Sequence, residues 1–245
     1  MRCRSVSLSC KGKINHLIRL PLIQRCLNNF NSHYLAEHSI LFGGGTRIAL
    51  ELDEYRESVD IDFLCRDKKS FRAVREQVTN RTLGELVKED FIYSRDIMFD
   101  RYGVRTFLDI EGVRIKLGFV AFDNYALEKG SGADLFNVPF IDRTSCFITK
   151  LLANADRWMQ KPYKDIFDLI AMSENWGGIP PEAYAEAHTH YGVYAVNNSL
   201  KRALQHLRNN HIAYREEAEA MGVQREYFDN VVLPGSERLL STLLM

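Results

Sequence analysis

Phe42-Gly43-Gly44-Gly45-Thr46-Arg47, joined downstream by Asp60-Ile61-Asp62, is the stretch around which the rest of the sequence can be arranged. The apolar residues 39–42 predict a short buried strand that the glycines end. Thr46 is expected to be the N-cap of a helix over residues 47–55, because its hydroxyl can accept a backbone N–H of the first turn. Glycines at a strand-to-helix turn let the backbone approach a phosphate closely, and the start of a helix favours an anion. The stretch therefore predicts half of a nucleotide site.

Two aspartates predict the other half of that site. Acidic and apolar side chains alternate over residues 59–64, which predicts a strand with Asp60 and Asp62 on one face. Adjacent carboxylates can hold Mg²⁺ (or Mn²⁺) while leaving positions for phosphate oxygens. Other phosphate motifs fit less well, because no Lys-Ser/Thr pair follows the glycines and Ile48 occupies the last glycine position of a dinucleotide fingerprint. The simpler alternative is a tight turn followed by a solvated strand face.

Composition bounds the class of protein. The 245 residues are 46% hydrophobic and 26% charged, which is typical of globular proteins and excludes disordered and fibrous classes. Lys+Arg and Asp+Glu both number 32, so any site for a polyanion must be local. The five cysteines lack CxxC spacing, so we expect a cytoplasmic setting with neither a disulfide framework nor a zinc site. No apolar run approaches the ~18 residues of a membrane span, so no membrane partner is expected.

The predicted order of elements is α+β in the first half and all-α in the second. Pro139 separates an expected domain over residues 1–138, with a basic leader and first helix at 1–36, from a helical domain over 139–245. A basic leader is preferred to a targeting peptide because the segment lacks a signal-peptide core. Helices are predicted at 14–30, 47–55, 70–82, 142–160, 164–174, 181–189, 195–209 and 212–220, and strands at 39–42, 59–64, 91–99, 104–110 and 113–120, with Glu111-Gly112 as a tight hairpin.

The glycine and aspartate motifs together resemble the first signature of the nucleotidyltransferase superfamily, and specifically of the AbiEii/AbiGii toxin family. The residues that carry the resemblance are Gly44-Gly45-Thr46, the helix through Leu50, Arg56, Ser58 and Asp60-Ile61-Asp62. The resemblance implies a minimal nucleotidyltransferase fold, a mixed sheet with flanking helices, followed by an all-α C-terminal helical bundle. It also implies the toxin half of a bacterial toxin–antitoxin or phage-defence system.

A second signature resembles that family in the helical half. Lys150, Asn154 and Arg157 share one face of a predicted helix, because they are spaced at i, i+4 and i+7. Downstream, residues 163–169 resemble the basic-Asp-x-x-Asp-Leu element of the family, with Asp165 and Asp168 as its acids. In the family the acid positions a triphosphate-binding lysine. The alternative for the downstream element is a solvated charged face.

The sequence departs from the family at the third carboxylate. Ile115-Lys116-Leu117 supplies the apolar-Lys-apolar step that precedes this acid, but Gly118 follows it. Such an acid helps to hold the metal or accepts the proton of the attacking group. Asp109 or Glu111 on the neighbouring strand is the expected substitute, unless the register differs. A catalytically impaired nucleotide-binding or antitoxin-binding module is therefore the alternative function.

The resemblance implies transfer of a nucleoside monophosphate from an NTP to a hydroxyl of RNA, with the tRNA acceptor end as first choice, or of protein. The expected catalytic residues are Asp60 and Asp62, which bind the metal and orient the α-phosphate, and Lys150, which with Lys164 neutralises triphosphate charge. The other residues expected at the nucleotide are Gly44, Gly45, Thr46, Arg47, Arg56, Ser58, Asp165 and Asp168, with Arg56 and Ser58 supporting the glycine turn.

Partners beyond the NTP follow from the same resemblance. A cognate antitoxin is expected, and a scaffold whose helical half binds that antitoxin without nucleotide is a further alternative. A basic stripe could contact RNA, although a solvated helix face explains it equally well. The stripe consists of Arg66, Lys68, Lys69, Arg72 and Arg75.

Overall fold

A five-stranded mixed sheet organises the first half of the chain in the computed structural model, which describes residues 16–132 and 136–243. The strand order is β1 (Ile40–Gly43), β2 (Ile61–Cys65), β5 (Val113–Ala121), β4 (Gly103–Ile110) and β3 (Met98–Phe99). Only β2 and β5 are parallel, and the other neighbours are antiparallel. The β4–β5 hairpin turns at Glu111 and Gly112, both with positive φ, as a tight two-residue hairpin requires.

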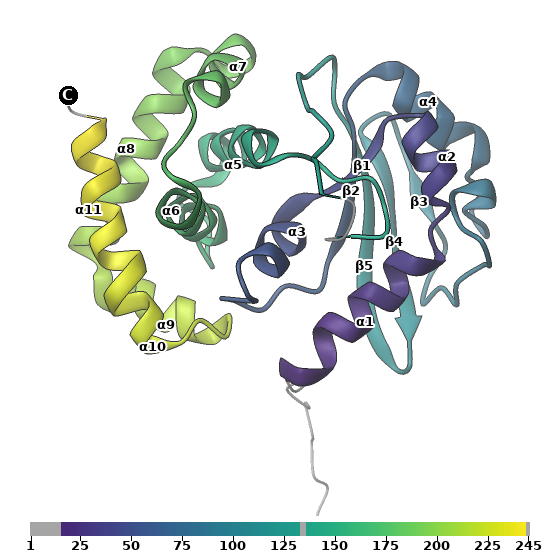
Figure 1. Ribbon diagram of the computed structural model, residues 1–245, viewed down its shortest axis with the longest axis horizontal. Coiled ribbons are helices and arrows are strands. Elements are labelled where there is room, and N and C mark those ends of the chain that lie inside the picture. Colours follow the sequence, from purple (N-terminus) through teal and green to yellow (C-terminus); the bar gives the residue numbers. More distant parts are fainter. Residues whose placement is uncertain (1–15, 133–135, 244–245) are drawn as a thin grey trace, which may run out of the picture.

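The two faces of the sheet have different covers, because side chains alternate along each strand. On one face, residues such as Phe63, Leu117 and Leu108 form a core with α1 (His16–Asn29), α2 (Ser32–Glu37) and α4 (Lys68–Gln77). Figure 1 shows these helices on one side of the sheet and α3 (Gly44–Glu51) on the other, toward the helical half. The second face carries Leu41 and Leu64 into the core of that half.

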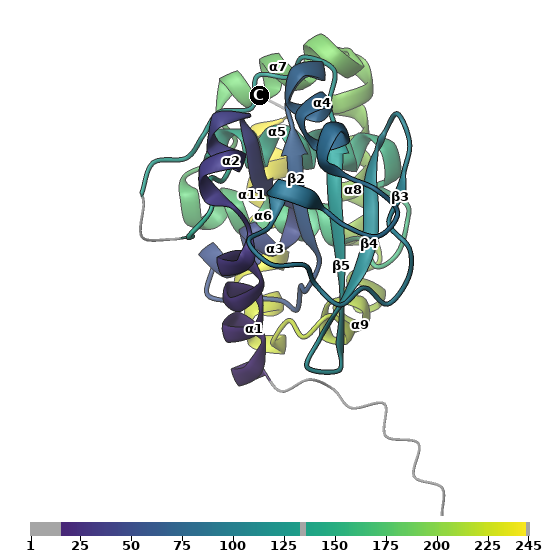
Figure 2. The same cartoon turned by 90° about the vertical axis from the view of Figure 1, so that its right-hand side faces the viewer.

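The second half of the chain is helical and shares its core with the sheet. Leu41, Ile48 and Leu64 join apolar residues of the helical half in one buried cluster, and Figure 2 shows those helices behind the sheet. The proposed division at residues 138 and 139 stays a prediction. The elements of this half are α5 (Arg143–Arg157), α6 (Lys164–Trp176), α7 (Pro181–Tyr191), α8 (Val193–Asn209), α9 (His211–Ala220), α10 (Arg225–Tyr227), the π-helical segment η2 (Phe228–Val232) and α11 (Leu233–Thr242).

The predicted fold class is confirmed, with a mixed sheet and flanking helices followed by helices. Thr46 is not the N-cap of α3, because the helix begins two residues earlier at Gly44 and Gly43 precedes it. The strand predicted over 91–99 is reduced to Met98–Phe99 and an isolated bridge between Tyr93 and Leu108 of β4, because pairing is interrupted between them, where the N–H of Ile97 donates to the carbonyl of Asn80. Three helices were missed, since α2 and α10 are too short to show a helical period and α11 contains Pro234 near its start.

Some predictions concern residues 1–15. Most of the basic leader, with Cys3 and Cys10, lies outside the described residues. The other cysteines, Cys26, Cys65 and Cys146, are buried free thiols. Within the described ranges, none of the helices combines the length and the apolar character needed to cross a membrane.

Candidate active site

The glycine turn is packed tightly against charged side chains from other elements. Gly44 has a φ of +74°, and a Cβ there would lie 2.8 Å from Asp62 Oδ2. A Cβ on Gly45 would lie 2.4 Å from Arg56 Nη2. Since no ordinary Cβ contact is that short, both positions exclude a side chain unless a charged group moves. The turn therefore brings bare backbone to the edge of the pocket described below.

The aspartate pair lies beside this turn. Asp62 is on β2, paired in register with Gly43 of β1 and with Gly118 of β5, so a glycine lies on each side of it. Asp60 immediately precedes the strand. Burial and the neighbouring Asp60 raise the pKa of the Asp62 carboxyl, although Lys116 opposes the shift. A nearby cation would lower the pKa of such a carboxyl, because the cation favours its charged form.

A pocket of about 300 Å³ joins these groups to cations from the helical half. Its acidic residues are Asp60 and Asp62, and Gly44 and Gly45 form part of its wall. Its basic residues are Lys116, Lys150, Arg157 and Lys164. One wall is thus suited to a hard cation and the other to a polyphosphate, which is the charge distribution of a metal–triphosphate complex.

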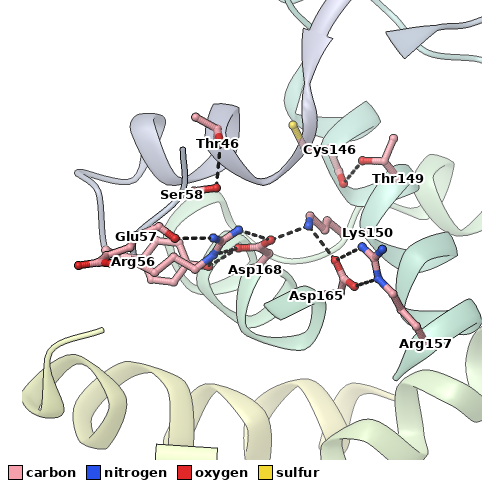
Figure 3. Close-up of polar contacts among 11 residues, drawn as sticks. Thr46, Arg56, Glu57, Ser58, Cys146, Thr149, Lys150, Arg157, Asp165 and Asp168 are labelled. Atoms are coloured by element: carbon pink, nitrogen blue, oxygen red, sulfur yellow. Dashed lines mark hydrogen bonds and ion pairs between the residues drawn. The ribbon is translucent and has the colours of Figure 1, made fainter. Parts of the chain in front are cut away.

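Beneath the pocket lies an ion-pair network of Arg56, Lys150, Arg157, Asp165 and Asp168, all buried except Arg157 (Figure 3). Lys150 Nζ lies 2.8 Å from Asp165 Oδ1 and 2.6 Å from Asp168 Oδ2. Arg56 makes a two-pronged contact with Asp168, with Nε–Oδ1 at 2.7 Å and Nη2–Oδ2 at 2.9 Å. Arg157 binds Asp165 through Nε at 2.6 Å. The network fastens α5 and α6 to the loop that follows α3.

The charges of this network are locked in their ionised forms. Burial by itself would raise the pKa of Asp168, but Arg56 and Lys150 lower it below its ordinary value. For Lys150 the directions are reversed. Burial by itself would lower its pKa, but Asp168 and Asp165 raise it above its ordinary value. Lys150 lines the pocket but is 5% exposed, and two carboxylates already neutralise it. It is therefore a positioning group as much as a phosphate ligand.

Lys164 and Lys116 are the basic residues of the pocket that form no ion pair with any residue in the described ranges. Lys164 comes from the helical half, at the start of α6. Burial, Lys150 and Arg157 lower its pKa. An incoming phosphate would relieve this repulsion, because an opposite charge favours the charged form of an amine.

The remaining predicted residues lie around the pocket rather than in it. Thr46 Oγ1 and Ser58 Oγ are hydrogen-bonded at 2.8 Å, so the pair braces the start of α3. Arg47 is 1% exposed, contacts Glu51 at 2.6 Å and lies near the rings of Phe140 and Trp176, so it is a core residue that does not reach the pocket. Lys116 was not predicted as a site residue, although its i+2 spacing from Gly118 places both on the pocket face.

The donor set at the aspartates fits a divalent cation only in part. Two carboxylates provide hard oxygen ligands of the kind that Mg²⁺ prefers. No group of three His, Cys, Asp or Glu side chains suited to a metal occurs among residues 16–132 and 136–243. Phosphate oxygens and water would have to supply the remaining ligands.

The pairing of β2 with β5 shows which residue occupies the position expected for a third carboxylate. Gly118 pairs with Asp62, and a Cβ on Gly118 would lie 2.8 Å from Asp62 Oδ1. The expected substitutes are wrong, because both belong to the hairpin at the far end of β4. Asp109 accepts a hydrogen bond from the N–H of Gly112 at 3.0 Å, and Glu111 pairs with Arg25.

Comparisons with known proteins identify the family and the fold. A protein-family model described as "Nucleotidyl transferase AbiEii toxin, Type IV TA system" matches residues 25–234. The crystal structure of a candidate nucleotidyltransferase from H. pylori is similar, with a TM-score of 0.55 and 14% identity over 94% of this chain and 98% of that one. JHP933 from Helicobacter pylori is similar with a TM-score of 0.50 and 14% identity over 93% of each chain. At such identities the structural likeness shows the fold alone. No curated protein matches the chain.

Proposed function

The chain belongs to the AbiEii nucleotidyltransferase toxin family, and we propose that its pocket transfers a nucleoside monophosphate from an NTP to an acceptor hydroxyl. One observation carries the proposal. A single pocket of about 300 Å³ combines paired carboxylates, a bare glycine turn and basic side chains on the opposite wall.

In this proposal each wall has its own task. Asp60 and Asp62 hold Mg²⁺ (or Mn²⁺) and face the α-phosphate, and the backbone at Gly44 and Gly45 approaches the β- and γ-phosphates. When bound, the metal would neutralise phosphate charge and bring reacting oxygens together. Lys164 neutralises the charge that grows on the leaving pyrophosphate.

The reaction needs little covalent participation from the protein. The acceptor hydroxyl gives up its proton to water, and its oxygen forms a bond to the α-phosphorus. The bond from that phosphorus to the bridging oxygen breaks, and the electron pair leaves with pyrophosphate. Positioning and electrostatic stabilisation supply most of the rate in such transfers. The buried network serves positioning, because Asp165 and Asp168 fix Lys150 at the floor of the pocket.

The proposal also covers the acceptor molecule, the antitoxin partner and the cellular location. RNA, with the tRNA acceptor end first, is the preferred acceptor, and a protein hydroxyl is the other choice. As the family implies, a cognate antitoxin controls the protein. We place its action in the cytoplasm, in keeping with the absence of disulfides among the described cysteines.

A second candidate function has its own observation in favour. Asp60 and Asp62 are the only carboxylates that line the pocket in the described part of the chain, and Gly118 occupies the register position opposite Asp62. A protein lacking the third acid can bind nucleotide without turning it over. The second candidate is therefore a non-catalytic nucleotide-binding or antitoxin-binding module.

A labelling experiment separates the two candidates. The protein is incubated with Mg²⁺ or Mn²⁺ and each α-³²P-labelled NTP, with and without total RNA, beside the double variant Asp60→Ala/Asp62→Ala and the exposed-site control Asp96→Asn. We expect label on RNA or on the protein itself, lost in the double variant and kept in the control. NTP binding by calorimetry without transfer of label would select the non-catalytic module.

A further inference from the structure

The sheet face that carries Asp62 continues past the pocket toward the β3 edge, and this outer part is basic and aromatic. Register pairs place Asp62 of β2, Gly118 of β5 and Arg105 of β4 in one row across the sheet. In the adjacent row, Phe107 pairs with Lys116, which also lines the pocket. Paired residues share a face, so these side chains lie on the side opposite α1, α2 and α4, behind the sheet in Figure 2.

Phe107 is an aromatic side chain without an apolar environment. It is half-buried, and it belongs to none of the hydrophobic clusters formed by the described residues. Its neighbours are instead cationic, with Arg95 Cζ 4.6 Å and Arg114 Cζ 5.8 Å from the ring centroid. Met98, which is 59% exposed, pairs with Arg105 at the edge of the same face.

The charge of this surface is positive although the chain is neutral overall. Its basic side chains are Arg95, Arg105, Arg114 and Lys116, all exposed. The acids nearby are Asp109, which shares the face, and Asp100, which is already paired with Arg105 at 2.5 Å. We call Arg95, Arg105, Phe107, Arg114 and Lys116 the sheet platform.

We propose that the sheet platform binds the acceptor as a single-stranded nucleic acid, with a base stacked on Phe107 and phosphates held by the surrounding arginines. This inference rests on the proposed function. Stacking on an aromatic ring combined with a cationic surface is how proteins bind single strands without reading sequence. Arg105 and Asp62 lie in the same row on strands β4 and β2, which are two strand spacings, about 10 Å, apart, so a nucleic acid strand on the platform can present its terminal hydroxyl to the pocket.

The basic stripe predicted from the sequence is not part of this surface. Its residues lie on or near α4, whose buried Val74 packs into the core on the opposite side of the sheet. Arg66 and Lys68 have acidic partners, and Arg75 covers the ring of Phe99. Arg72 on that helix therefore provides a matched control for loss of one positive charge on the opposite side of the sheet.

Binding of a fluorescein-labelled single-stranded RNA dodecamer, followed by anisotropy without NTP, tests the inference on the full chain. We expect Phe107→Leu to weaken binding about 5- to 150-fold and Phe107→Trp to retain it, because stacking on an aromatic ring accounts for that range. Arg114→Gln should reduce the slope of log K against log salt by about 0.7, whereas Arg72→Gln should leave it unchanged. Thermal melting of each variant checks its fold.

Three outcomes would overturn the platform. The first is that the wild-type protein does not bind the RNA. The second is that wild type and Phe107→Leu bind the RNA with equal affinity. The third is that a polyglutamate peptide displaces the labelled RNA as well as unlabelled RNA of the same charge does. NTP binding by calorimetry distinguishes this failure from that of the proposed function. RNA binding that needs Phe107, without transfer of label, supports the platform and contradicts catalysis. Transfer of label without RNA binding contradicts the platform alone.

Discussion

Replacement of Asp168 by asparagine tests the structural role of the buried ion-pair network. The Asp168 carboxylate is fully buried and accepts hydrogen bonds from the Tyr55 hydroxyl, from two nitrogens of Arg56 and from Lys150. Asparagine keeps the size of the side chain and removes its charge. Arg56 would lose its only carboxylate partner within the described residues, and Lys150 would lose one of two.

The size of the effect follows from this burial. Removing one partner of a buried ion pair costs about 3 to 5 kcal/mol, because the remaining charge stays out of water without compensation. For a chain of this length, each kcal/mol shifts the melting temperature by about 2 to 4 °C, so Asp168→Asn should lower it by about 6 to 20 °C. The exposed Asp96→Asn should change the free energy of unfolding by less than about 0.5 kcal/mol.

Thermal and urea unfolding, both followed by circular dichroism, measure this difference. The same preparations should show weaker NTP binding by calorimetry for Asp168→Asn, because Lys150 is no longer fixed at the floor of the pocket. A melting temperature for Asp168→Asn equal to that of Asp96→Asn would refute the reasoning, since it would mean that the network contributes nothing to folding.

Four further changes test other parts of the site. Lys164→Met should weaken NTP binding by calorimetry about 10- to 150-fold through loss of a charge-assisted contact, and an unchanged affinity would contradict its role. Gly44→Ala should lower Mg²⁺ affinity, because the new Cβ would displace the carboxylate of Asp62, and should cost about 1 to 2 kcal/mol of stability at this positive φ. Gly118→Ala should also lower Mg²⁺ affinity, because its Cβ would lie 2.8 Å from Asp62 Oδ1 and displace that carboxylate, and equal titrations would count against the assigned register. Lys150 and Arg157 hold the pKa of Asp165 below its ordinary value despite burial. The difference in unfolding free energy between wild type and Asp165→Asn should therefore be complete above about pH 4 and shrink as the pH falls. A larger difference at pH 3, measured by urea unfolding, would contradict this.

Local patterns in the sequence were enough to predict the parts of the site that lie on single elements. Alternation over residues 59–64 placed Asp60 and Asp62 together, and both line the pocket. The i, i+7 spacing of Lys150 and Arg157 on one helix face matches their shared contact with Asp165. The structure brings these side chains together because strand and helix periods fix which side chains are neighbours.

Contacts between distant segments could not be predicted in the same way. Arg56 and Asp168 are 112 positions apart, and their pairing depends on how α6 packs against α3. Arg47 was assigned to the nucleotide because it follows the glycines, but its position on α3 directs it to Glu51 and two aromatic rings. Phe107 gave no signal as a site residue, because its arginine neighbours come from other strands and loops.

The central claim is that the pocket performs nucleotidyl transfer, and the fate of both labels in a doubly labelled NTP tests it most directly. The protein is incubated with Mg²⁺, RNA and NTP labelled at the α- and γ-phosphates, and products are separated from free nucleotide. The account predicts equal amounts of α-label on the acceptor and γ-label in pyrophosphate, both abolished by Asp62→Asn. Gamma-label on the acceptor, or bound NTP that yields no product, would contradict it.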